Sequence, residues 1–154
     1  MKTYAIIGAV IVFATVVYFT GVYTYFIRTE VHEALPASVG GEGGRRVIAS
    51  GTFGAVDFIH KGFGYAKLLE IDGKRMLRLE DFQVTNGPDL YIYLATGEAP
   101  TNDIKSLGDY IDLGPLKATM GEQNYDVPTA DARYKTAVIW CKKFGVLFSY
   151  AVMR

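Results

Sequence analysis

The chain has 154 residues, enough for one domain of ordinary size plus an appendage. Its 16 basic and 16 acidic side chains cancel, and residues 47–154 alone carry twelve Lys and Arg against thirteen Asp and Glu. A nucleic-acid-binding protein needs a basic face to neutralise phosphates, so this balance argues against a nucleic-acid partner. The 11 Tyr, 9 Phe and 17 Gly are typical of strands and turns rather than of helices.

The N-terminal segment is apolar and uncharged from Tyr4 to Ile27, a run of 24 residues. A helix of that length measures ~36 Å and crosses a hydrocarbon core of about 30 Å with some tilt. We therefore predict a transmembrane helix, a signal anchor, within residues 1–29. A cleaved signal peptide is the alternative, with Ala34 to Ala37 as an imperfect cleavage site. It fits less well, because the apolar core of a signal peptide usually has only about 7–15 residues.

Basic residues near the two ends of this run set its predicted orientation. Lys2 and the α-amino group precede the run, whereas Arg28 follows it and is diluted by Glu30 and Glu33. Because basic residues favour the cytoplasmic side, we expect the N-terminus inside the cell and the rest of the chain outside the cytoplasm. The predicted localisation is a single-pass membrane protein with an extracytoplasmic C-terminal domain.

Residues 30–46 have the composition of a flexible stalk. Four glycines occupy the five positions from Gly40 to Gly44, and Pro36 precedes them. Such a segment buries little apolar surface. We therefore predict a tether between the anchor and a domain over residues 47–154.

Residues 47–154 contain short apolar runs with twofold alternation, separated by turn residues. The pattern is typical of half-buried strands, and turns about every 8–12 residues indicate an antiparallel β-sandwich or barrel. We predict an all-β domain of about eight or nine short strands, including a tight hairpin turn at Asp72-Gly73 that needs positive φ. One short helix is expected, at Asn102 to Leu107. The candidate strands are residues 47–53, 65–71, 75–84, 90–95, 110–113, 123–127, 137–141 and 146–152.

A series of motifs follows in order along this domain. Its opening contains a Gly-x-Phe at residues 51–53, followed by Asp57 and His60. The later motifs lie at residues 77–82, 85–94, 112–117, 121–128 and 138–144, the last of which contains Ile-Trp-Cys. The series closely resembles the DM-thirteen family, the electron-transfer DM domain, over the whole of residues 47–154.

This resemblance implies a β-rich extracytoplasmic domain with one characteristic cysteine, which matches Cys141. It also implies a redox or electron-transfer role, through a bare thiol or through a bound prosthetic group such as haem. A redox partner protein in the cell envelope would then exchange electrons with the domain.

The residues around Cys141 leave three interpretations open. As the single cysteine it has no internal disulfide partner, so it is a small buried hydrophobe, a reactive thiol or one half of an intermolecular disulfide. Its predicted strand places Ile139 on the same face and Trp140 on the opposite face. A reactive thiol needs partial exposure and nearby positive charge, and Lys143 falls on the Cys141 face if the strand continues.

His60 follows Asp57 by three residues and has two interpretations of its own. It could ligate haem or a metal with its ring held by the carboxylate, or it could be a turn histidine that caps a hairpin. His60 and Cys141 together are candidate axial ligands of a haem. The sequence lacks Cys-x-x-Cys-His and paired-cysteine zinc spacing, so we predict no metal site.

Two functions follow from these observations. The first is a membrane-tethered extracytoplasmic module with a redox or electron-transfer role centred on Cys141, with His60 as an assisting residue. The second is a non-catalytic interaction or adhesion module of the cell envelope, in which Cys141 belongs only to the core. In both cases we expect an accessory module rather than an enzyme, and the spacing of residues gives no Ser/His/Asp or paired-carboxylate arrangement.

Overall fold

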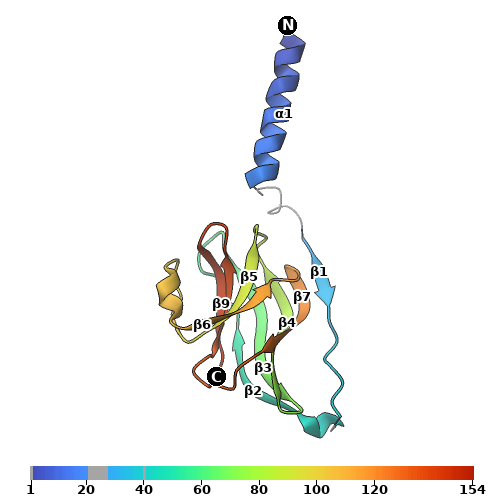
Figure 1. Cartoon of the computed structure of the whole chain (residues 1–154), viewed down its shortest axis with the longest axis vertical. Coiled ribbons are helices and arrows are strands. Elements are labelled where there is room, and N and C mark those ends of the chain that lie inside the picture. Colours follow the sequence, from blue (N-terminus) through green and yellow to red (C-terminus); the bar gives the residue numbers. More distant parts are fainter. Residues whose placement is uncertain (1, 21–27, 40) are drawn as a thin grey trace.

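The computed structural model describes residues 2–20, 28–39 and 41–154. Two β-sheets lie face to face, and an N-terminal helix lies above them in the view of Figure 1. Short apolar runs between Gly, Pro and Asp turns explain why so many short strands form. The helices are α1 (Lys2–Thr20) and the short 3₁₀ helices η2 (Gly41–Gly44) and η3 (Ile104–Leu107). The strands are β1 (Glu30–His32), β2 (Arg45–Thr52), β3 (Gly62–Ile71), β4 (Lys74–Val84), β5 (Leu90–Ala95), β6 (Tyr110–Pro115), β7 (Met120–Val127), β8 (Thr136–Cys141) and β9 (Val146–Val152).

The first sheet has five strands in the order β1-β7-β4-β3-β2, and the second has four in the order β6-β5-β8-β9. The predicted sandwich is therefore confirmed, with nine strands among the described residues. The predicted alternative of a barrel is wrong, because the strands form two separate sheets. Ser50 of β2 and Arg154 exchange two backbone hydrogen bonds of 3.0 Å at one edge. Arg154 lies beyond the end of β9, so this contact does not close the sheets into a barrel.

The main core lies between the two sheets, where alternate residues of each strand point inward. In β5 the side chains of Leu90, Ile92 and Leu94 join this core, whereas Tyr93 belongs to a second cluster on the outer face of the four-stranded sheet. The two faces follow directly from the twofold period of a strand. Eight predicted strands are found at or near the expected residues for this reason.

The β3–β4 hairpin has the turn that the sequence predicts. Asp72 and Gly73 both adopt positive φ, 50° and 79°, which matches a two-residue turn of the type that follows the twist of a hairpin. The turn sets the register in which Ile71 faces Lys74 and Leu69 faces Met76. This register places the apolar residues of both strands on the same face of the sheet.

The outer face of the four-stranded sheet is covered by the connection between β5 and β6. Leu107 of η3 is fully buried in the outer cluster with Trp140, and Tyr110 stacks on Tyr93 with ring centroids 4.9 Å apart. The short helix predicted at 102–107 is thus present as η3, capped by the side chain of Asp103, which accepts a hydrogen bond from the Lys105 amide. Leu107 and the single Trp, Trp140, are buried in the same cluster, so this connection helps to keep Trp140 away from solvent.

Part of the segment predicted as a stalk lies along the first sheet. Residues Glu30–His32 form β1, which pairs in parallel with β7 and was not predicted. Gly121 of β7 makes this approach possible: it has φ +94°, and a Cβ there would lie 2.0 Å from the Val31 carbonyl oxygen. The described stalk residues are therefore attached to the domain at this point rather than extended away from it.

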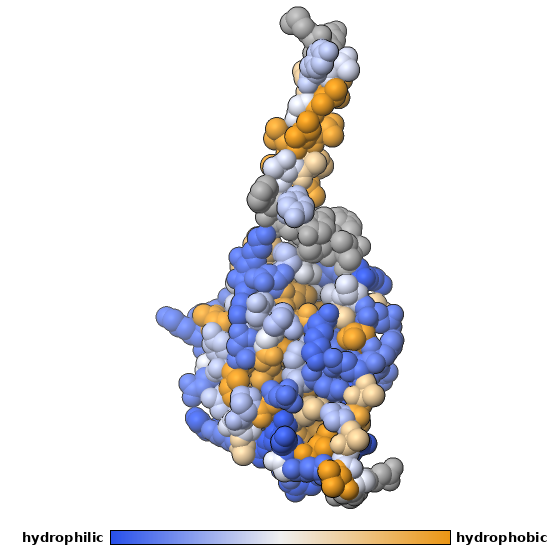
Figure 2. Space-filling model, turned by 45° about the vertical axis from the view of Figure 1, so that its right-hand side comes forward, coloured by the Kyte–Doolittle hydropathy of each residue, from blue (hydrophilic) through white to orange (hydrophobic). Residues whose placement is uncertain are grey.

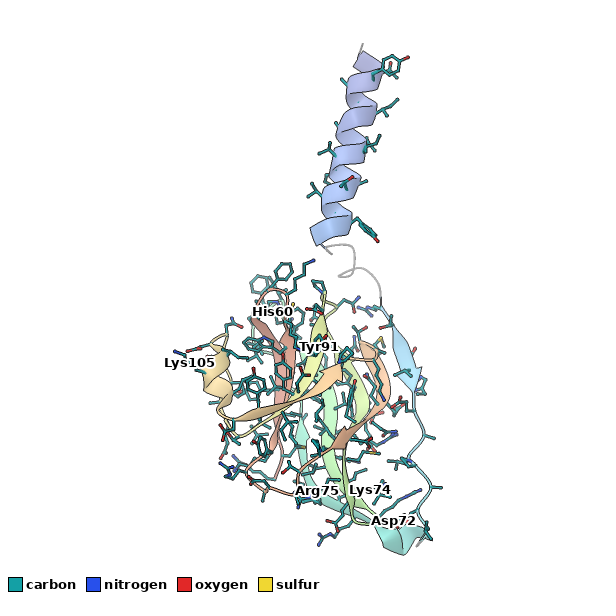
Figure 3. The ribbon with its side chains drawn as sticks, viewed as in Figure 1. His60, Asp72, Lys74, Arg75, Tyr91 and Lys105 are labelled. Atoms are coloured by element: carbon teal, nitrogen blue, oxygen red, sulfur yellow. The ribbon has the colours of Figure 1, made fainter. Side chains whose placement is uncertain are left out.

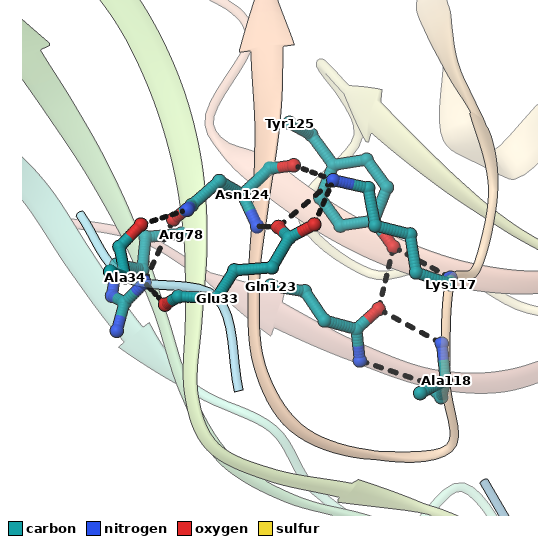
Figure 4. Close-up of polar contacts among 8 residues, drawn as sticks. All are labelled: Glu33, Ala34, Arg78, Lys117, Ala118, Gln123, Asn124 and Tyr125. Atoms are coloured by element: carbon teal, nitrogen blue, oxygen red, sulfur yellow. Dashed lines mark hydrogen bonds and ion pairs between the residues drawn. The ribbon is translucent and has the colours of Figure 1, made fainter. Parts of the chain in front are cut away.

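Polar contacts after β1 hold the segment on the sheet (Figure 4). The Glu33 carboxylate accepts hydrogen bonds from Lys117 Nζ at 2.8 and 2.9 Å and from the Asn124 amide at 2.7 Å. Arg78 Nη1 donates to the Glu33 carbonyl and to Asn124 Oδ1, both at 2.8 Å. Burial alone would raise the pKa of Glu33, but the hydrogen bonds from Lys117 and Asn124 and the charges of Lys117 and Arg78 outweigh it and lower the pKa. The contacts thus favour the ionised carboxylate.

The face of α1 seen in Figure 2 carries many apolar side chains. Ile6, Ile11 and Val12 are 60–64% exposed and, at about 100° per residue, point in three different directions. In the part of the chain that the structure describes, no helix is both long and apolar enough to cross a membrane. Residues 21–27 of the predicted span lie outside the described residues.

Candidate functional site

Cys141 is the last residue of β8 and lies in the main core. It is fully buried in the cluster that contains Ile139, while Trp140 joins the outer cluster, as the alternation predicts. Its thiol donates a hydrogen bond of 2.9 Å to the carbonyl oxygen of Pro88, in the loop that precedes β5. The sulfur is therefore covered by protein on all sides and has a backbone partner.

The surroundings of Cys141 favour the neutral thiol. Burial, the largest influence, raises the pKa of Cys141, and the backbone amides of Phe144 and Lys143 oppose that effect only in part. The strand does not continue to Lys143, so the condition under which Lys143 would fall on the Cys141 face is not met. The strand ends at Cys141, because a turn over residues 142–145 follows, in which Gly145 has φ +64° and donates its amide to the Cys141 carbonyl. A solvent-facing thiolate is thus not present in this arrangement.

His60 lies at the end of a tight turn that Asp57 holds. One oxygen of the Asp57 carboxylate accepts the backbone amides of Ile59 and His60 at 2.7 and 2.6 Å, and the other bonds His60 Nδ1 at 2.7 Å. The hydrogen bond from the His60 ring is the largest influence that lowers the pKa of Asp57 to about 2. Both sequence interpretations therefore describe part of the geometry: the carboxylate orients the ring, and the histidine belongs to a turn.

Phe148 of β9 connects the His60 turn with the loop that covers Cys141. Its ring lies against the His60 ring, with centroids 4.5 Å apart. The same ring also packs against the backbone of Gly87, where a Cβ atom would lie only 2.5 Å from it. The next residue, Pro88, accepts the hydrogen bond from Cys141. The two predicted site residues thus lie at the same end of the sandwich, joined through Phe148 and the Gly87–Pro88 backbone rather than by direct contact.

The pair does not fit the two axial positions of a haem as arranged here. To act as an axial ligand, the Cys141 sulfur would have to face a cavity. It is instead enclosed in the core, and its thiol donates a hydrogen bond to the Pro88 carbonyl oxygen. The Phe148 ring packs against the His60 ring, with centroids 4.5 Å apart. The bond between His60 Nδ1 and Asp57 leaves Nε2 as the nitrogen for a ligand, but only 17% of the His60 side chain is exposed. Haem binding by this pair would require the cover of Cys141 to open.

A metal site is not formed either among the residues that the structure describes. No three side chains of His, Cys, Asp or Glu come together there in an arrangement that could hold an ion. The sequence motifs singled out Cys141 and His60, which stay predictions as site residues. They missed the connecting role of Phe148, whose only sequence signal is its place in a predicted strand.

Comparison with known proteins gives one match. The family described as "Electron transfer DM13" matches residues 52–153, which include the His60 turn, the Pro88 loop and Cys141. No curated protein and no solved structure was found to match the chain.

Proposed function

Because the chain belongs to the electron transfer DM13 family, we propose that it is a membrane-tethered extracytoplasmic module with an electron-transfer role centred on Cys141. The observation that carries this proposal is the family match, which covers the only cysteine of the sequence together with the turn and loop that enclose it. The family's description supports the redox role, and the burial of Cys141 beneath the Pro88 loop is compatible with a thiol that reacts only when this cover opens.

The thiol is gated by its surroundings. It becomes accessible only when the Pro88 loop or the turn over residues 142–145 opens, because both lie over the end of β8. The opened thiolate can attack a disulfide of a partner protein, forming a mixed disulfide while the partner's second sulfur leaves as a thiolate. Since the sequence has one cysteine, a thiol of another molecule then attacks the Cys141 sulfur, which releases the partner as a dithiol and leaves Cys141 in a new mixed disulfide; attack by the partner's own thiolate would only reverse the first step.

The proposed tether is the apolar run from Tyr4 to Ile27. Its 24 uncharged residues suffice to cross a bilayer, and the exposed apolar side chains of α1 would find partners in lipid. Lys2 before the run supports a cytoplasmic N-terminus. Carbonate extraction of cell membranes tests the tether: the chain should stay in the membrane pellet, and release of a shortened chain that begins near Ser38 would favour a cleaved signal peptide.

Trapping a partner at Cys141 tests the redox role. Membranes that contain the full chain are treated with a mild oxidant, quenched in acid and separated on non-reducing gels. We expect a reducible adduct of the chain with an envelope protein, absent from Cys141→Ser. An absorption spectrum of the purified chain is recorded in parallel, because a band above the aromatic region would assign the role to a bound prosthetic group instead. Absence of both an adduct and such a band would refute the electron-transfer proposal.

A second function is favoured by one specific observation. Cys141 is fully buried, and its hydrogen bond to Pro88 satisfies it as a core residue. On that account the domain is a non-catalytic interaction module of the cell envelope. Cys141→Ala would then leave the binding of envelope partners unchanged, whereas the redox function requires the sulfur.

A further inference from the structure

Three connections meet at the end of the sandwich where the chain joins the domain from its N-terminal side. The turn at residues 57–60, the loop at 85–89 and the turn at 142–145 are linked by backbone bonds, from the Thr85 amide to the Lys61 carbonyl and from the Lys142 amide to the Asp89 carbonyl. Thr29, the second described residue after the gap, is tied to the same end, because its carbonyl accepts the amides of Thr119 and Met120. Figure 3 shows His60 at this end, the one nearest to α1. We call it the proximal end.

Large apolar side chains project from the tips of two of these turns. Phe58 is 83% exposed, Ile59 is 49% exposed and Phe144 is 50% exposed. The fold does not need them, since none belongs to either core cluster. Aromatic and aliphatic residues at neighbouring loop tips, away from the core, form an apolar surface that favours contact with a second phase or molecule.

Basic side chains lie at the same end of the domain. Arg28, Lys61 and Phe63 line one shallow hollow, and Lys143 precedes Phe144 with its Nζ 5.9 Å from the ring centroid. The acidic residue of the 57–60 turn, Asp57, is occupied by hydrogen bonds to that turn and its histidine. The proximal end therefore combines apolar tips with basic neighbours, a pattern that suits an interface between acyl chains and anionic headgroups.

The length of the connecting chain limits how far this end can lie from a bilayer. If the span proposed above ends at Ile27, only Arg28 separates it from Thr29, and two residues reach at most about 7 Å. The bonds of Thr29 to Thr119 and Met120 are part of the domain itself. The edge of the proximal end that carries Thr29 is then held at short range from the membrane.

We propose that the proximal end is a lipid-docking surface, in which Phe58, Ile59 and Phe144 enter the headgroup layer of an anionic bilayer and Arg28, Lys61 and Lys143 contact its phosphates. The inference rests on the tether of the proposed function. It deepens that function, because the turns and the loop that cover Cys141 are the ones that meet the lipid. Docking would fix the position of the redox end relative to membrane-bound partners.

Hydrogen exchange of the full chain in nanodiscs tests this surface. The chain is reconstituted in discs of phosphatidylcholine, with or without phosphatidylglycerol, and exchange is followed by mass spectrometry. We expect peptides that contain residues 57–61 and 142–145 to exchange several-fold more slowly in the anionic discs, and high salt to reduce the difference. A double variant, Phe58→Ser with Phe144→Ser, should lose this protection.

Val47→Ser is the matched control, because Val47 is 56% exposed on β2 and lies away from the proximal end. It should keep the lipid-dependent protection. Trp140 fluorescence confirms that each variant is folded. Failure of the chain to co-elute with the discs would refute the tether. Co-elution with equal exchange in both discs would instead overturn the docking surface alone. Protection that depends on protein concentration without lipid would also overturn it, since a second copy would then cover this surface.

Discussion

Replacing Glu33 by Gln removes the charge that holds the segment after β1 on the sheet. The carboxylate accepts hydrogen bonds from Lys117 at 2.8 and 2.9 Å and from the Asn124 amide at 2.7 Å. Hydrogen bonds to charged groups contribute about 1.5–3 kcal/mol each when shielded. The side chains of Glu33 and Lys117 are 29% and 41% exposed, so solvent screening reduces the expected loss to about 1–2 kcal/mol.

Denaturant unfolding of the full chain in detergent measures this loss. The single Trp, Trp140, is buried, so its fluorescence reports unfolding of the domain. Glu30→Gln is the control: Glu30 lies in β1 and forms an ion pair with the exposed His32, and we expect a change below about 0.5 kcal/mol. Equal effects of the two variants would refute the assignment of Glu33 as the residue that fixes the segment.

The pH dependence gives a second readout of the same contact. The pKa of Glu33 is lowered by folding, so its contribution is fully present above the ordinary value of 4.5 and is lost as the pH falls through the folded pKa. The stability difference between wild type and Glu33→Gln should therefore be constant from pH 7 to about pH 5 and shrink in more acidic solution. A difference that persists at pH 2 would show that the carboxylate charge is not its source.

Three other predictions concern separate parts of the domain. His60→Gln should raise the pKa of Asp57 from about 2 towards its ordinary value of 3.8, which an NMR titration of the carboxyl measures; an unchanged value would contradict the contact. Cys141→Ser should cost only about 1 kcal/mol in unfolding experiments, because its hydroxyl can donate to the same carbonyl; a cost above about 3 kcal/mol would argue against that hydrogen bond. Gly121→Ala should displace β1, seen as faster hydrogen exchange of Val31, and retained protection there would contradict the close approach.

The sequence predicted those parts of the fold that depend on local pattern. Twofold alternation placed Leu90 and Ile92 in the core and Cys141 beside Ile139, and Asp72-Gly73 supplied the hairpin turn. It could not predict β1, because Glu30–His32 is a three-residue polar strand without a measurable period. Its parallel pairing with β7 depends on the missing side chain of Gly121, a tertiary effect.

The contacts of the candidate site were also predictable only where they are local in the sequence. The spacing of Asp57 and His60 predicted their contact, which is local. The burial of Cys141 beneath the Pro88 loop and the contact of His60 with Phe148 join segments far apart in the chain, so no local pattern reveals them. Lys143 lies in the turn after β8, because the strand ends at Cys141. The ends of strands are the least certain feature of a sequence pattern, so this position could not be predicted.

The most direct test of the gated thiol is the rate at which native full-length protein reacts with a small aromatic disulfide at increasing denaturant concentration. If the Pro88 loop or the 142–145 turn opens locally, Cys141 reacts under native conditions, more slowly than a free thiol, and the rate is nearly independent of denaturant below the unfolding transition. Weakening the cover with Pro88→Ala should raise that rate without an equal loss of global stability. If Cys141 is only a core residue, the rate follows the global free energy of unfolding at every denaturant concentration. That result would contradict the account.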